Sequence, residues 1–290
     1  MFKMKKILLP VDFSERAIGA ARYAEALADH YGGEVNILHV IPAPHYEFGA
    51  LEAGGSMIGD LYANRRKVLE QQCATFLTEE LPKLQAVRVV KEGDPSREIV
   101  LYAHDLGMDL IVMPTHGYGP FRRFILGSVT SKVLHDADCP VLTGVHLEEA
   151  PEPERIHFQT VLVAIDLREH SQQVLRWAHE LAATQKARLI LAHVTPSIEG
   201  KAGEYFDPDW RLHLADQAKS AIDKLQAQVG SSAEVVVEGG EAHLAVCELA
   251  SQQKADLLVI GRGSAAGVFG RLRTHAYSII RLSPCPVVSV

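Results

Sequence analysis

Short, continuous apolar segments alternate with longer amphipathic segments along the whole chain. The short segments are rich in Val, Ile and Leu throughout, which indicates strands that are buried on both faces of a parallel sheet. Their alternation with helices predicts right-handed crossovers and an open, doubly wound α/β fold. In the first half the pattern predicts strands at residues 7–11, 35–40, 87–91, 110–114 and 141–145, and helices at 14–31, 59–81, 95–105 and 128–136.

Residues at the expected helix ends agree with these boundaries. Ser14 and Asp94 are favourable N-cap residues, and Pro95 suits the first helical position because its missing N–H group would have no partner there. Pro82 cannot continue a helix, so it is expected to end the long helix that precedes it.

The second half of the chain repeats the first in the same order. "KKILLPVDFS" returns as "QTVLVAIDLREHS", "DLIVMPTHG" returns as "DLLVIGRGS", and "DCPVLTGV" returns as "PCPVVSV". The offset is 154 residues between Asp12 and Asp166 but 147 between Asp109 and Asp256, so the second copy is shorter. We expect most of this loss in the loop that reads "IPAPHYEFGALEAGGSMIG" in the first copy.

A Pro- and Glu-rich segment, "HLEEAPEPERIHF", separates the two copies and has the composition of a linker. We therefore expect one domain at residues 1–146, a linker at 147–158 and a second domain at 159–290. Each copy ends in an apolar strand, and bare strand edges of that kind tend to be paired. The two copies are expected to pair with each other, while a homodimer of whole chains is left open.

Composition limits the classes of partner. The 290 residues are 47% hydrophobic, enough for a sizeable core, and the net charge of −7 argues against non-specific nucleic-acid binding. No apolar run approaches the roughly 20 residues that a membrane helix needs. The N-terminal apolar run "ILLPV" is too short for a signal peptide, so we expect a cytoplasmic protein without a membrane partner.

The four cysteines show neither a C-x-x-C motif nor a zinc-site spacing, so we expect no metal site. Cys139 and Cys285 each open a "CPV" segment before a strand. We interpret them as buried, reduced thiols rather than redox groups.

Two segments that follow predicted strands have the character of a ligand site, "PVDFS" and "PTHGYGPFRRFILGS". In doubly wound sheets, ligands bind beyond the carboxyl ends of the strands. Gly117 and Gly119 permit tight turns, and Gly127 and Ser128 open a helix whose first N–H groups favour an anion. The segment is either a phosphate site or a plain helix cap.

Asp12 also has two interpretations. Its carboxylate could accept hydrogen bonds from a ribose or an adenine amino group, or it could cap the helix that begins near Ser14. His39 and His193 recur at matching strand ends, which is more typical of packing than of a catalytic base. His116 is interpreted as a loop side chain rather than a ligand-binding group.

The first copy resembles a universal stress protein domain. The family signature is Gly-x-x-Gly, nine residues, then Gly-Ser or Gly-Thr, and it matches at Gly117, "YGPFRRFIL", Gly127 and Ser128. The strand ends "PVDFS" and "LHV" match as well, and the two copies together extend the resemblance over nearly the whole chain. The resemblance implies two Rossmann-like five-stranded parallel sheets of strand order 3-2-1-4-5. It also implies ATP or a related adenine nucleotide, with Mg²⁺ as a candidate companion ion.

By this resemblance the first copy holds the nucleotide where the winding reverses. Val11, Asp12 and Val40 would hold adenine and ribose, and Gly117, Gly127, Ser128 and Val129 would hold phosphates; Pro10, Met113 and Pro114 complete the expected site. Pro114 departs from the signature because it replaces the first glycine and has no N–H group to donate.

The second copy departs further, so we expect a degenerate second site. Arg273 and Thr274 stand where the first copy has Gly127 and Ser128, and an arginine side chain either fills the phosphate space or binds a phosphate itself. Arg262 and Arg271 are close to Arg273 in the sequence. The residues assigned to this degenerate site are Asp166, Val194, Gly261, Gly263, Ser264, Arg273 and Thr274.

Three functions follow from these patterns. The first is a regulatory stress protein that binds one adenine nucleotide in its first copy. The second is an interaction scaffold that binds no nucleotide. The third is an ATP-splitting ligase, which the absence of "SGGxDS", "HIGH" and "KMSKS" segments disfavours. No nucleophile–base pair is evident in the sequence, so we expect any ATPase activity to be slow and incidental.

Overall fold

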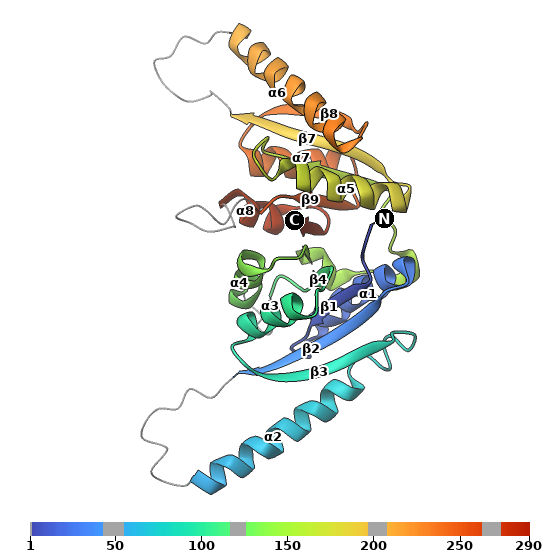
Figure 1. Cartoon of the computed structure of the whole chain (residues 1–290), viewed down its shortest axis with the longest axis vertical. Helices are drawn as coiled ribbons and strands as arrows, with labels where there is room; N and C mark the ends of the chain where they lie inside the picture. The colour runs from blue at the N-terminus through green and yellow to red at the C-terminus, as the bar shows by residue number, and fades with distance from the viewer. Residues whose placement is uncertain (1, 43–54, 117–125, 197–207, 263–273) are drawn as a thin grey trace.

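The computed structural model describes residues 2–42, 55–116, 126–196, 208–262 and 274–290. Each half of the chain contributes five strands and four helices to this part (Figure 1). The first half contains β1 (Lys6–Pro10), α1 (Glu15–Tyr31), β2 (Glu34–Pro42), α2 (Gly55–Thr75), β3 (Ala86–Gly93), α3 (Pro95–Asp105), β4 (Leu110–Val112), α4 (Ser128–Asp136) and β5 (Val141–Thr143). The second half contains β6 (Thr160–Ala164), α5 (Ser171–Gln185), β7 (Arg188–Pro196), α6 (Pro208–Val229), β8 (Glu234–Gly240), α7 (Ala242–Gln252), β9 (Leu257–Ile260), α8 (Thr274–Leu282) and β10 (Val287–Ser289).

The ten strands form one sheet in the order β3-β2-β1-β4-β5-β10-β9-β6-β7-β8. Each half therefore has the expected 3-2-1-4-5 order, and every pairing within a half is parallel. The halves join through an antiparallel pairing of β5 with β10, in which Val141 lies opposite Ser289 and Thr143 opposite Val287. The expectation that the two copies pair through their terminal apolar strands is confirmed.

Helices cover both faces of this sheet, and each face carries a hydrophobic core that includes residues of both halves. One core contains Leu27 of α1 and Leu175 of α5, and the other contains Val133 of α4 and Ile280 of α8. The continuous Val, Ile and Leu runs of the strands supply both cores because neighbouring residues point to opposite faces. The halves thus share their cores as well as their sheet.

The helix expected at residues 59–81 ends earlier, at Thr75. Leu77 adopts a left-handed backbone conformation, with φ of 68°, and its side chain is buried. The Thr78 hydroxyl donates to the Thr75 carbonyl at 2.7 Å and so satisfies one of the carbonyls exposed at the helix end. Burial of Leu77 thus ends the helix before Pro82 is reached.

The shortening of the second copy also lies in a different place from the expected one. The loops before the long helices differ by one residue, because α2 begins at Gly55 and α6 at Pro208. After the long helix, the first half needs residues 76–85 to reach β3, whereas the second half reaches β8 through residues 230–233. Most of the loss therefore follows the helix rather than preceding it.

The segment between the halves packs closely onto α1. It forms two short 3₁₀ helices, η1 (Val145–Glu149) and η2 (Pro153–Arg155). Leu147 and Ala150 are buried, and Arg22 of α1 donates to the Ala150 carbonyl at 2.6 Å. The linker composition thus belongs to a segment that is built into the core.

All four cysteines are free thiols; Cys73, Cys247 and Cys285 are buried as a core residue would be, whereas Cys139, which was also expected to be buried, is half-buried. Burial raises the pKa of Cys139, Cys247 and Cys285 to about 11 each, and raises that of Cys73. A thiol with a raised pKa carries little thiolate at neutral pH and reacts slowly. This agrees with the interpretation of Cys139 and Cys285 as unreactive, reduced thiols.

Within the described ranges, no helix has the length and apolar character needed to cross a membrane.

Candidate functional site

The candidate site of the first half lies where β1 and β4 end side by side. β2 and β3 continue the sheet from one side of β1, and β4 and β5 from the other, so the winding reverses between these two strands. Pro10 ends β1, Val11 and Asp12 follow it, and Met113 and Pro114 follow β4. The structure thus brings five of the expected residues to one edge of the sheet. Val40 lies near the end of β2, the neighbouring strand.

Asp12 organises the start of α1. One carboxylate oxygen, Oδ1, accepts hydrogen bonds from the backbone N–H of Ser14 at 3.0 Å and from its hydroxyl at 2.6 Å. Ser14 occupies the N-cap position, but its hydroxyl points back to Asp12 and makes no cap bond to the helix. The other oxygen, Oδ2, accepts no hydrogen bond from a described residue and is the one that remains for a ligand.

The two strand-end histidines hold backbone in place. The Nδ1 of His39 donates to the Val11 carbonyl at 2.9 Å, and His193 makes the same bond to Ile165. Burial lowers the pKa of His39, which keeps its ring neutral near pH 7. Phe13 stacks on this ring with centroids 4.2 Å apart. These contacts agree with a packing role for both histidines.

The start of α4 is tied to the end of β4. The Gly127 N–H donates to the Thr115 carbonyl at 2.8 Å, and the Thr130 hydroxyl donates to the Pro114 carbonyl at 3.1 Å. A Cβ atom at Gly127 would lie 3.2 Å from both the Thr115 oxygen and the His116 Cα. The glycine therefore permits a close approach between this helix and the chain that leaves β4. His116 follows β4 outside the regular elements, as expected for a loop side chain, and it is buried.

Among the residues that the structure describes, none caps the first turn of α4 with its side chain. Gly127 is the N-cap residue and makes no cap bond, Ser128 is exposed as the first helical residue, and Val129 is half-buried. Helix N-terminal N–H groups without a cap carry the positive end of the helix dipole and attract anions. Gly117, the remaining residue expected to hold phosphate, lies outside the described residues.

The second half contains a cavity of about 670 Å³ at the equivalent edge of the sheet. Asp166 and Gly261, which follow β6 and β9, line it together with Val194 of β7. Its apolar floor is formed by Ile165, Val174, Ala192, Val246, Ile260 and Ile279. Gly263, Ser264 and Arg273 lie outside the described residues, and of Thr274 the structure gives only its place as the first residue of α8.

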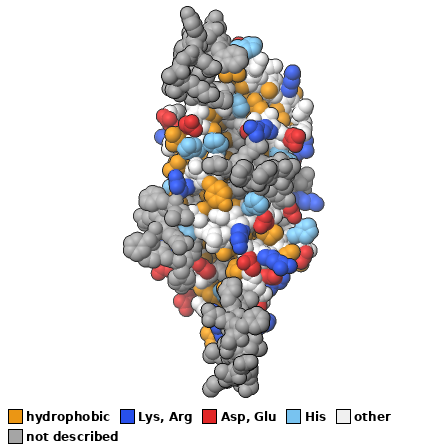
Figure 2. Space-filling model, turned by 90° about the vertical axis from the view of Figure 1, so that its left-hand side faces the viewer, with side chains coloured by type: hydrophobic (Ala, Val, Ile, Leu, Met, Phe, Trp, Pro, Cys, Tyr) orange, Lys and Arg blue, Asp and Glu red, His pale blue; other side chains and the backbone are white. Residues whose placement is uncertain are grey.

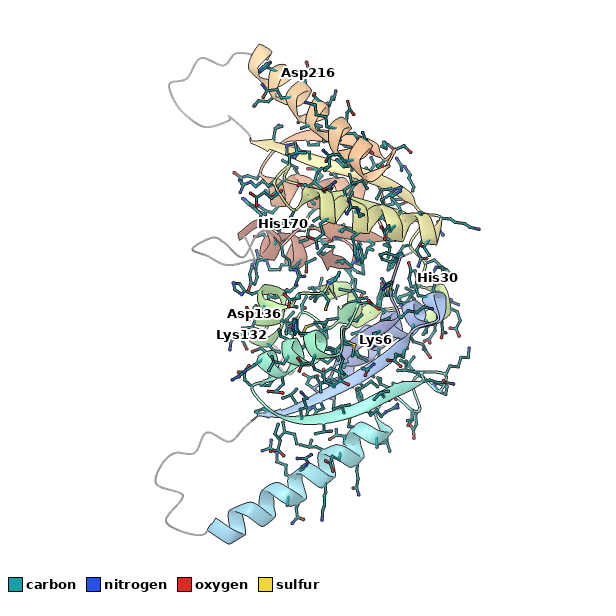
Figure 3. All side chains as sticks on the ribbon, viewed as in Figure 1. Lys6, His30, Lys132, Asp136, His170 and Asp216 are labelled. Atoms are coloured by element: carbon teal, nitrogen blue, oxygen red, sulfur yellow. The ribbon has the colours of Figure 1, made fainter. Side chains whose placement is uncertain are left out.

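Charged and titratable residues that the sequence interpretation missed line the rim of this cavity. Arg168 and His170 precede α5, and His275 lies in the first turn of α8 (Figure 3 shows His170 at the start of α5). Figure 2 shows histidine side chains gathered on this face of the second half. The polar segment "DLREHS" could have revealed these residues. Because α5 begins only at Ser171, later than the matching helix of the first half, Arg168 and His170 stay in the loop beside the cavity.

Arg262 points away from the second site and into the first half. It is buried, and its guanidinium donates to the carbonyls of Ala137 and Cys139 at 2.8 Å each and to that of Leu134 at 3.5 Å. These carbonyls lie at the C-terminal end of α4, where a positive charge is favourable. Arg262 is therefore a helix cap that joins the halves, and its proximity in sequence to Arg273 does not make it a phosphate ligand.

The fold defines a duplicated, doubly wound α/β protein in which the winding of each half reverses at the strand ends, and in the second half these strand ends line a cavity. The chain belongs to the universal stress protein family, whose model matches residues 3–143 and again residues 157–290. Two universal stress proteins of Methanocaldococcus jannaschii are each 32% identical to 48% of this chain, over 80% and 93% of their own lengths. The crystal structure of a universal stress protein from Archaeoglobus fulgidus superposes on 99% of this chain and 98% of its own with a TM-score of 0.68 at 23% identity.

Proposed function

We propose that the first half binds ATP or a related adenine nucleotide, and that the chain is a regulatory stress-response protein rather than an enzyme. The observation that carries the proposal is the uncapped N-terminus of α4, fixed beside the ends of β1 and β4. A site of this kind binds phosphate through backbone N–H groups and needs no lysine. The resemblance of the Gly127–Ser128 segment to the family signature supplies the ligand class.

The rest of the proposed site suits an adenosine. Val11, Val40 and Met113 are buried side chains at the strand ends and offer apolar contact to a base. Asp12 keeps one carboxylate oxygen for a ribose hydroxyl or an amino group, while its other oxygen holds the start of α1. Mg²⁺ remains a candidate companion of the phosphates.

The hydrogen bonds of Asp12 and His39, the ionisable residues at these strand ends, support a regulatory role. Asp12 holds Ser14, and His39 holds the Val11 carbonyl, so both act on the protein backbone. Slow hydrolysis of a bound nucleotide would be incidental to such a site. Binding would instead change the surface that the strand ends present.

Ser128→Asp tests this proposal without harming the fold. A carboxylate in the first helical turn stabilises a helix, yet here it would repel the phosphates. Titration calorimetry with ATP should show at least about tenfold weaker binding than for the parent, equivalent to about 1.4 kcal/mol. Ser128→Ala, which keeps the backbone N–H groups, should bind much more tightly than Ser128→Asp.

Gln71→Glu is the charge-matched control, because Gln71 is exposed on α2 and outside the proposed site. Equal ATP binding by parent and Ser128→Asp would refute the phosphate site. Absence of nucleotide binding in the parent would favour the scaffold function instead.

We propose that each chain binds one nucleotide. The double change Arg273→Gly with Thr274→Ser should raise the stoichiometry measured by calorimetry toward two nucleotides per chain.

A further inference from the structure

A second, smaller cavity lies away from the strand ends that form the candidate nucleotide site. It measures about 300 Å³ and is bounded by the last turns of α1, the segment that joins the halves, and Gln185 at the end of α5. α1 carries the chain from the carboxyl end of β1 back to the start of β2. Its last turns therefore lie near the amino-terminal ends of the strands, on the side of the sheet opposite to the candidate nucleotide site. Figure 3 labels His30, one of the lining residues, at the side of α1 where the two halves meet.

Glu25 is the unusual residue of this cavity. It lines the cavity, is only 4% exposed, and its Oε1 atom is buried without a hydrogen-bond partner among the described residues. A buried carboxylate without a partner loses the hydration of its charge and gains nothing in return. Asp29 and Glu154 also line the cavity and add negative charge.

Two cations close to Glu25, Lys83 at the same cavity and Arg22 on the same helix, bond other groups. Lys83, which lines the same cavity, bonds Glu154 at 2.7 Å. Arg22, three residues before Glu25 on α1, donates to the Ala150 carbonyl at 2.6 Å and pairs with Glu152 at 2.9 Å. Lys83 and Arg22 thus bond the connecting segment, and within the described part of the chain neither of them bonds the Oε1 atom of Glu25.

Part of the cavity wall is apolar. Leu27 and Phe158 are 3% and 5% exposed, and Pro153 and Ile156 complete this side of the cavity. A cavity lined by both carboxylates and hydrocarbon side chains matches an ammonium group carried on an alkyl chain. The volume is at the small end of the range for ligand sites.

We propose that this cavity binds a small aliphatic amine of the diamine or polyamine class, with the Glu25 carboxylate accepting from its ammonium group. The amine would supply the donor that Glu25 lacks and lay its alkyl chain against Leu27, Ile156 and Phe158. The second half offers no copy of this site, since His179 stands at the position that corresponds to Glu25.

The proposal also predicts that amine affinity depends on pH through the protonation of Glu25. Burial raises the pKa of Glu25, with further increases from Asp29 and Glu154 and a smaller decrease from Lys83. A raised pKa means that the carboxyl takes up its proton at a higher pH than usual, whereas the amine binds its ionised form. Amine affinity should therefore fall as the pH drops through this pKa, and binding in that range should release protons. The other charged or titratable groups facing the cavity or its neighbours are Asp29, His30, Lys83, Glu152, Glu154 and His157.

Titration calorimetry of the full chain with putrescine and with spermidine, at pH 8 and moderate salt, tests the proposal. We expect one saturable site per chain, and affinity at least about tenfold weaker in Glu25→Gln, a change that keeps the shape of the side chain. Glu248→Gln, an exposed change on α7 with the same loss of charge, should bind as the parent does. Because Glu25→Gln removes an unpartnered buried charge, its melting temperature without amine should equal or exceed that of the parent.

Three results would overturn the proposal. The first is no saturable amine binding by the parent, and the second is equal affinity in parent and Glu25→Gln. The third is an equal, Glu25-dependent response to Mg²⁺ alone, which would identify a site for an inorganic cation. Nucleotide binding is a separate readout, so Glu25→Gln should leave ATP affinity unchanged and the two proposals fail independently.

Discussion

Arg262 shows how one side chain can join two halves of a chain. Its guanidinium caps the C-terminal end of α4, while its backbone directly follows Gly261 at the rim of the second cavity. The guanidinium is buried, so its hydrogen bonds to carbonyl groups are protected from competing water. A lysine could not replace it, because a single ammonium lacks the planar fork that reaches several carbonyls at once.

We expect Arg262→Ala to lower the free energy of unfolding by about 2–4 kcal/mol, because it removes a buried charged donor and leaves carbonyls of α4 unpaired. Urea denaturation checks this value, and Arg262→Lys should recover only part of the loss. Arg281→Ala serves as the control for loss of an arginine, since Arg281 lies on the exposed side of α8. A loss no larger than that of the control would show that the cap contributes little.

The sequence could not predict this role of Arg262. Its position beside a glycine-rich segment is typical of a phosphate ligand, and the direction of its side chain depends on the packing of α4 from the other half. Asp12 is a contrasting residue. The carboxylate and the nearby Ser14 suffice to predict a helix-start turn, because the contact is local in sequence.

At the scale of elements, the two ends of α4 have different surroundings. Its N-terminal turn faces the proposed nucleotide site without a cap, and its C-terminal turn is held by Arg262. Gly127 lets the first turn approach the chain that leaves β4. The position of the N–H groups that we propose for phosphate binding therefore depends on packing between helix and loop.

Gly127→Leu should abolish nucleotide binding and lower the free energy of unfolding by about 1–3 kcal/mol. The backbone at Gly127 has φ of −60°, which any residue can adopt, so the expected effect is steric. The added side chain would push against Thr115 and His116 and move the helix away from the strand end. Calorimetry with ATP and urea denaturation measure the two effects, and unchanged binding would show that the close approach is dispensable.

Elements were predictable where their signal is local. Continuous apolar runs revealed the strands, and the Asp94-Pro95 pair fixed the start of α3, where Asp94 accepts from the Arg97 N–H at 3.0 Å. The end of α2 was not predictable, because it depends on burial of Leu77 in a core that forms only in the folded chain. The same holds for the cavity at Glu25, which needs three distant segments to meet.

At the scale of the whole molecule, one sheet and two shared cores connect the halves. β5 and β10 lie in the middle of the sheet, and the N-terminus of the chain lies between the halves (Figure 1). The N-terminal Phe2 packs between Tyr31 of the first half and Trp177 of the second, with its ring centroid 5.6 Å from each of theirs. Gln185 of α5 adds a hydrogen bond to the Tyr31 hydroxyl at 3.3 Å. The pairing of copies was predictable from their apolar terminal strands, but these additional contacts were not.

We expect the chain to unfold in a single cooperative transition, because neither half can lose its structure without exposing the shared cores. Tryptophan fluorescence and far-UV circular dichroism should give coincident urea curves. Val288→Asp, which places a charge in the joining strand β10 at a 2% exposed position, should separate the curves or lower the midpoint sharply. Leu282→Asp, at an exposed position, should do neither. Two separated transitions in the parent would show that the halves are energetically independent.

The antiparallel junction of β5 with β10 has a consequence for how the halves can diverge. In an assembly of two identical chains, each substitution appears on both sides of the interface, so a change that suits one site is imposed on the other. Here the pairing is within one chain and does not depend on protein concentration, and each half always meets the same partner. A substitution such as the arginine at position 273 is therefore carried once, beside a half that keeps glycine at position 127. Covalent linkage thus frees the two sites to become different while the sheet that joins them stays the same.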